Sequence, residues 1–122
     1  MELQTERRLE QFLQLVGLPG NHISERMEFS LSPFHLYIEC IDNDILLSVG
    51  REVELAWQVE VLERLLTAAI PARTQGVPLR PWLLRGRQML SCTLSASGDI
   101  PHWFHCLQTM QRLLDNAIGV KK

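Results

Sequence analysis

Features that mark several familiar classes of protein are missing from this sequence of 122 residues. No apolar run reaches the roughly 18 residues that a membrane-spanning helix requires, so we expect no membrane insertion. The N-terminus is charged from Glu2 to Arg8 and has no apolar signal-peptide core, which predicts a cytoplasmic protein. The formal net charge is only −2, and without a strong positive field we expect no nucleic-acid partner.

Catalytic motifs are missing as well. The sequence contains no Walker A loop, no G-x-G-x-x-G, no G-x-S-x-G and no H-E-x-x-H. It has 3 cysteines, an odd count with no C-x-x-C pair, and such thiols are typical of small buried hydrophobes rather than of a disulfide framework. We therefore predict a protein that is not an enzyme and that needs no cofactor and no metal.

One group of side chains could still bind a metal. On a helix, His102, His105 and Cys106 lie close together, and Cys92 could add a fourth zinc-type ligand. No zinc motif with this spacing has a matching second half here, so a small metal-binding protein is the least favoured reading. A catalytic thiol at Cys40 or Cys92 is disfavoured too, because both lie in predicted strand centres, where burial raises the pKa of a thiol.

The middle of the chain is locally basic, with Trp82 among its arginines. Arginine and an aromatic ring can together bind a nucleic acid, but arginines at a hairpin tip are more often a solvated end. The arginines of this basic segment are Arg73, Arg80, Arg85 and Arg87.

The turn at 42–44 contains two aspartates and could be taken for a calcium site. It supplies too few oxygens to bind calcium.

The composition that remains is that of a globular protein. Hydrophobic residues make up 46% and charged residues 21% of the chain, and its length fits one domain over residues 1–122. Apolar periodicity and turn residues divide this domain into helices and strands. We predict helices ending near Val16, over 52–70 and from Asp99 to Gly119, and strands over 26–31, 34–41, 45–49, 79–84 and 88–96.

The order of these segments is α-β-β-β-α-β-β-α. It predicts an α+β fold, in which a mostly antiparallel twisted sheet carries three helices packed on it. The helix over 52–70 differs from an ordinary surface helix because it has two apolar stripes, which implies burial on two sides. One stripe consists of Leu55, Val59, Leu62, Leu66 and Ala69, and the other of Val53, Trp57, Val61 and Leu65.

Several local sequences resemble the class I chaperones of bacterial type III secretion, and the resemblance spans essentially the whole chain. The first helix closes on Leu15-Val16-Gly17-Leu18-Pro19, similar to the family's LGLP-type ending. The Asp42-Asn43-Asp44 hairpin leads into the apolar strand Ile45-Leu46-Leu47, as in the family's second and third strands. Val77-Pro78-Leu79-Arg80, followed by Trp82-Leu83-Leu84, resembles the fourth-strand region of short members that serve gatekeeper proteins.

The resemblance implies a type III secretion chaperone of the bacterial cytoplasm, which dimerises and binds a partner. It would hold the N-terminal segment of a secreted effector or gatekeeper protein in a non-globular, secretion-competent state. The dimer would be a homodimer or a heterodimer with a second small chaperone, with Val53, Trp57, Val61 and Leu65 at its interface. The substrate groove would consist of Leu9, Phe12, Leu13, Met27, Phe29 and Leu31.

A second reading remains open. Exposed apolar surface also suits a non-catalytic adaptor or regulatory domain that binds a folded protein and has no role in secretion. The two readings differ in the partner: a chaperone binds a disordered segment, whereas the adaptor binds a folded surface.

Overall fold

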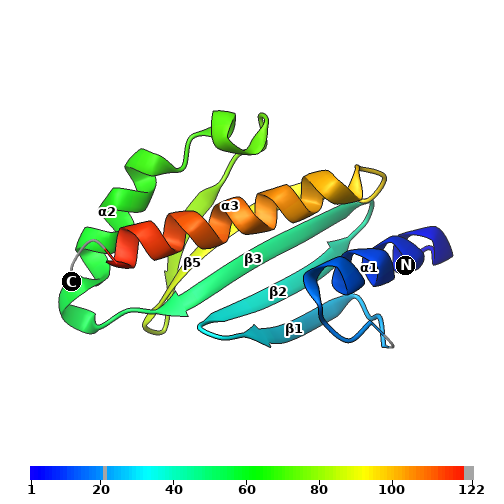
Figure 1. Cartoon of the computed structure of the whole chain (residues 1–122), viewed down its shortest axis with the longest axis horizontal. Coiled ribbons are helices and arrows are strands. Elements are labelled where there is room, and N and C mark those ends of the chain that lie inside the picture. The colour runs from blue at the N-terminus through cyan, green and yellow to red at the C-terminus, as the bar shows by residue number, and fades with distance from the viewer. Residues whose placement is uncertain (21, 120–122) are drawn as a thin grey trace.

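The computed structural model describes residues 1–20 and 22–119, whose course is shown in Figure 1. The elements follow in the order α-β-β-β-α-β-β-α, which confirms the predicted α+β class. The helices are α1 (Leu3–Val16), α2 (Gln58–Ala68) and α3 (Ile100–Gly119), with short 3-10 turns η1 (Leu55–Trp57) and η2 (Pro71–Thr74). The strands are β1 (Arg26–Leu31), β2 (Phe34–Ile41), β3 (Asp44–Glu52), β4 (Arg80–Leu84) and β5 (Arg87–Ser95).

The strands form one antiparallel sheet in the order β1-β2-β3-β5-β4. A tight turn at Arg85 and Gly86 joins β4 to β5, and both residues have the positive φ (46° and 83°) that the favoured hairpin turns require. The central pair is β3 and β5, which stay in register from Asp44 opposite Ser95 to Glu52 opposite Arg87. This long ladder makes β3 three residues longer at its end than the predicted strand, so the following helix begins later than expected.

All three helices contribute to the layer against one face of the sheet. Figure 1 shows α3 running along β3 and β5, with α1 and α2 on either side of it. The apolar stripe of α3 lies against the sheet: Trp103 and Leu107 are each 1% exposed and Met110 is fully buried. The ring of Phe12 from α1 meets Trp103 edge-on, with ring centres 5.8 Å apart. Burial of each such side chain stabilises the fold by about 1.5–3 kcal/mol. The core therefore lies between the helices and this face of the sheet.

None of the helices in the described residues is both long and apolar enough to cross a membrane. This finding agrees with the absence of long apolar runs in the sequence.

The other face of the sheet carries polar side chains that join three strands. Glu52 of β3 accepts a hydrogen bond from Nε of Arg87 at 3.0 Å, and Nε2 of His35 in β2 lies 3.2 Å from it. Arg87 also donates to the hydroxyl of Tyr37. Burial works against the charge of Glu52, but the hydrogen bonds from Arg87 and His35 hold the pKa of this carboxyl below its ordinary value.

The lowered pKa of Glu52 predicts a pH-dependent contribution to stability. A carboxylate whose pKa falls on folding stabilises the fold above its unfolded pKa of about 4.3, and the contribution is lost as the pH drops through the folded value. Glu52→Gln should therefore lower the melting temperature at neutral pH and leave it unchanged once the pH is below both values. Thermal melts followed by circular dichroism across this range measure the effect.

A matched control is Glu54→Gln, because Glu54 is exposed and makes no ion pair in the described part of the chain. Its melting temperature should follow that of the wild type at every pH. A constant difference between Glu52→Gln and the wild type at all pH values would rule out the charge of Glu52 as the cause.

Candidate partner-binding surfaces

The two apolar stripes of the second helical segment have different surroundings in the structure. Val61 and Leu65 are fully buried and Val53 is 7% exposed, because this side of the segment packs against the sheet and α3. The core of the protomer thus covers Val61 and Leu65 completely and most of Val53, and little of this stripe is left for a second subunit. Trp57, the fourth member, is 38% exposed and lies at the surface.

The other stripe is the open one. Leu55 is 85%, Val59 67% and Leu66 62% exposed, and Ile70 continues the series after the helix ends. We call these four residues the α2 ridge. The strand β4, against which α2 packs, adds the exposed Leu83, whereas Leu84 lies beside Arg87 on the other face of the sheet. Large apolar side chains gathered in this way on a small protein mark a surface that a partner covers.

The predicted groove residues of α1 belong to the core. Leu9 and Leu13 are fully buried and Phe12 is 2% exposed, since α1 packs against α3 through this side. A partner could reach these side chains only if α1 moved away. Leu15 on the same helix is 51% exposed and faces outwards.

The groove residues of β1 have a different setting. Met27, Phe29 and Leu31 alternate along the strand, and all three are half-buried against the margin of the core. The strand stands first in the sheet order, so its outer edge has no neighbouring strand in the described residues. An edge of this kind can accept an added strand from a peptide, with alternate side chains entering apolar pockets.

The two histidines of α3 form hydrogen bonds with the backbone of η2. Nε2 of His102 lies 3.1 Å from the carbonyl oxygen of Thr74, and Nε2 of His105 lies 3.2 Å from that of Arg73. A carbonyl only accepts, so both nitrogens donate, and the two rings hold η2 against α3. Cys106 is fully buried beside His102. Within residues 1–20 and 22–119, no three His, Cys, Asp or Glu side chains are arranged to hold a metal ion.

The thiols of the other two cysteines are not prepared for nucleophilic chemistry. The neighbouring thiol of Cys106, together with burial, raises the pKa of Cys92. Burial raises the pKa of Cys40 also, and the charge of Glu25 adds to the effect. A thiol with a raised pKa stays protonated at neutral pH, and only the thiolate is a good nucleophile.

The arginines of the middle segment do not all lie on one surface, although Arg85 and Arg87 line one hollow together with Glu52. Arg85 is at the hairpin tip and Arg87 is paired with Glu52 on the open face of the sheet. Arg73 lies in η2, beside α3. The sequence places these arginines close together, whereas the structure distributes them over different elements.

Comparison with known proteins identifies relatives over nearly the whole chain. A family model described as SsaM matches residues 2–117. A curated relative, the secretion system apparatus protein SsaM of Salmonella typhimurium (strain LT2), is 27% identical over 116 residues, which cover 94% of this chain and 93% of the relative.

Two solved structures have a similar fold. A chain of the ExsC–ExsE complex has a TM-score of 0.65 at 15% identity, covering 94% of this chain and 92% of its own length. A chain of the ExoT–SpcS complex from Pseudomonas aeruginosa has a TM-score of 0.64 at 14% identity, covering 95% of this chain and 98% of its own length. At this level of identity the likeness shows the fold.

The different burial of two leucines on α1 generates a stability prediction. Leu13→Ala should lower the free energy of unfolding by about 2–5 kcal/mol, because it leaves a cavity in the core. Leu15→Ala, the same change on the exposed side of the helix, should stay within about 0.5 kcal/mol of the wild type. Urea denaturation followed by tryptophan fluorescence measures both. Equally small effects would show that Leu13 belongs to an accessible groove, as the sequence suggested.

Proposed function

The chain belongs to the SsaM family, and on this premise we propose that it is a type III secretion chaperone of the bacterial cytoplasm. It holds the N-terminal segment of a secreted effector or gatekeeper protein in a non-globular, secretion-competent state. The observation that carries the proposal is the family match over residues 2–117. The family is one of secretion proteins and not of enzymes, in agreement with the predicted lack of catalysis.

The open surface of α2 supports the dimer that the proposal includes. The side chains expected to form the interface are buried in the core of the protomer, except that of Trp57. We therefore assign the second subunit to the α2 ridge of Leu55, Val59, Leu66 and Ile70. The second subunit is either another copy of this chain or a second small chaperone of the same fold.

The edge of β1 supports the binding of a cargo segment. Its half-buried Met27, Phe29 and Leu31 alternate at the spacing that an extended peptide can follow. The strand edge offers main-chain hydrogen bonds, which bind many sequences, and the apolar side chains select among them. A chaperone must bind its cargo without a folded cargo domain, and an open strand edge meets that requirement.

A charge on the α2 ridge tests the dimer. Leu66→Glu should convert the dimer into a monomer that keeps its circular dichroism spectrum, because Leu66 is 62% exposed in the protomer. Leu65→Glu, one residue earlier, should unfold the chain, since this side chain is fully buried. Light scattering behind a sizing column measures the mass in both cases. A Leu66→Glu protein with the mass of the wild-type dimer would move the interface away from the ridge.

A photo-crosslinking amino acid at Phe29 tests the cargo and the function together. Irradiation of cells of the source organism should join this position to the N-terminal segment of a protein that the secretion system exports. The same amino acid at Gln108, which is exposed on α3, should not capture that segment. Mass spectrometry identifies the captured peptide, and deletion of the chaperone gene should then reduce export of that protein several-fold. A captured partner that is folded and not exported would favour the adaptor instead.

A further inference from the structure

The main chain of β1 presents every second residue to the free edge of the sheet. Cys40 of β2 donates to the carbonyl oxygen of Glu25 at 2.8 Å, which fixes the phase of the ladder between the two strands. In an antiparallel pair, the main-chain groups of successive residues point alternately towards the partner strand and away from it. The N–H and C=O groups of Arg26, Glu28 and Ser30 therefore face the edge that has no neighbouring strand.

A serine occupies the first end of this edge. Oγ of Ser24 donates to the edge-facing carbonyl oxygen of Arg26 at 2.7 Å. In the described part of the chain, no hydrogen bond is made to the edge-facing groups of Glu28 and Ser30. An added strand therefore pairs mainly with Glu28 and Ser30, and only a few of its residues take part.

The face of β1 that points to the helices selects apolar residues. Met27, Phe29 and Leu31 lie on this face, opposite the buried side chains of β2, and they are half-buried against the core. Residues of an added strand that point to the same side would have these three as neighbours. Since side chains alternate along a strand, every second residue of the added segment should be apolar.

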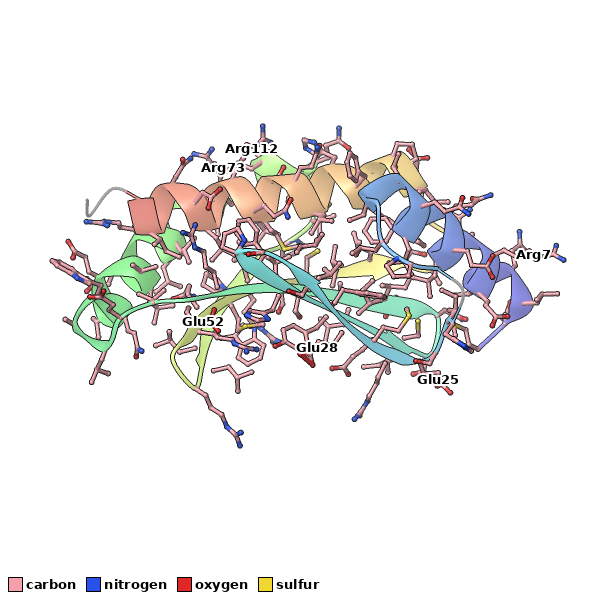
Figure 2. The ribbon with its side chains drawn as sticks, turned by 60° about the horizontal axis from the view of Figure 1, so that its bottom comes forward. Arg7, Glu25, Glu28, Glu52, Arg73 and Arg112 are labelled. Atoms are coloured by element: carbon pink, nitrogen blue, oxygen red, sulfur yellow. The ribbon has the colours of Figure 1, made fainter. Side chains whose placement is uncertain are left out.

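Glu28 determines the charge on the other face. Its exposed side chain shares this face with Tyr37, which is directly opposite on β2. Figure 2 shows Glu28 and Glu25 on the sheet side of the molecule. Glu28 makes no ion pair in the described residues, and Arg87 on the same face is already hydrogen-bonded to Glu52.

The remaining charges beside Glu28 leave this margin negative. Arg26, the cation of β1, has its Nε 3.9 Å from the carboxylate of Glu39, while Glu25 forms no ion pair in the residues that the structure describes. A lysine or arginine opposite Glu28 would gain a cross-strand ion pair, whereas an acidic residue would be repelled. A second copy of β1 centred on this position would place two Glu28 carboxylates opposite each other.

We propose that the β1 edge binds an extended segment in which apolar and polar residues alternate and a lysine or arginine faces Glu28. The assignment of this segment to a secreted protein rests on the proposed function. The preference for a basic residue rests on the edge itself and can be tested separately.

Two fluorescent peptides, SVTVKVTVS and SVTVEVTVS, are the probes, and their anisotropy is measured against the purified chain at physiological salt. Each sequence reads the same in both strand directions, so the peptides differ only in the central charge. The lysine peptide should bind about threefold to tenfold more tightly, because the exchange turns a cross-strand attraction into a repulsion. Glu28→Lys should reverse the order of the two affinities.

Two further variants locate the binding. Ser30→Pro removes an edge-facing N–H, which an edge strand tolerates, and both peptides should bind about tenfold or more weakly. The matched control is Glu63→Lys, the same charge change on an exposed residue of α2, which packs against β4 at the opposite edge of the sheet. It should leave both affinities within about twofold of the wild type. Circular dichroism verifies that the variants are folded.

Each contrary result has its own meaning. Equal affinities for the two peptides, or an unchanged order in Glu28→Lys, would overturn the charge preference and leave the edge as a cargo site. A wild-type chain that binds neither peptide would overturn the edge as well. A Ser30→Pro protein with a lower mass than the wild type in light scattering would assign the edge to a second copy of the chain. Export is measured separately by crosslinking and gene deletion, so failure of the proposed function is distinguishable.

Discussion

Burial of α3 against the central strands β3 and β5 is the interaction on which the rest of the structure depends. This helix brings Trp103, Leu107 and Met110 onto the longest ladder of the sheet, and α1 and α2 both pack against it. The helices have limited length, and they cover only one face of the sheet. Once α3 occupies the centre, the other two helices are left at the flanks, each with one side against the core.

The flanking positions explain where the molecule is left open. The segment around α2 is apolar on two sides, but the protomer offers a core to only one of them, so the ridge from Leu55 to Ile70 remains in solvent. At the opposite margin, β1 has a free edge because no further strand lies beside it within residues 1–20 and 22–119. Both surfaces follow from a small one-sided fold, and both suit a protein that works by binding other proteins.

Prediction from the sequence succeeded where the signal is local. Alternation identified β1 and β2 with their observed ends. Prediction was less accurate at the end of β3, where the strand continues beyond the predicted end at residue 49. Residues 50–52 continue the β3 ladder because Arg87 and its neighbours on β5 lie opposite, and no pattern within the segment itself reveals that pairing. The cluster of His102, His105 and Cys106 left a metal site as the least favoured reading, and only the structure shows that the distant carbonyls of Thr74 and Arg73 are the partners of the two histidines.

By itself the sequence determined the order of the helices and strands, the antiparallel sheet and the excess of apolar surface, because periodicity reports how regularly a segment meets an apolar environment. Only the tertiary structure decided which environment each stripe meets. Val61 and Leu65 differ from Val59 and Leu66 by a rotation about the helix axis, and both pairs are apolar. The packing of α2 against β4, β5 and α3 decides between them, and that packing depends on contacts between residues far apart in the chain.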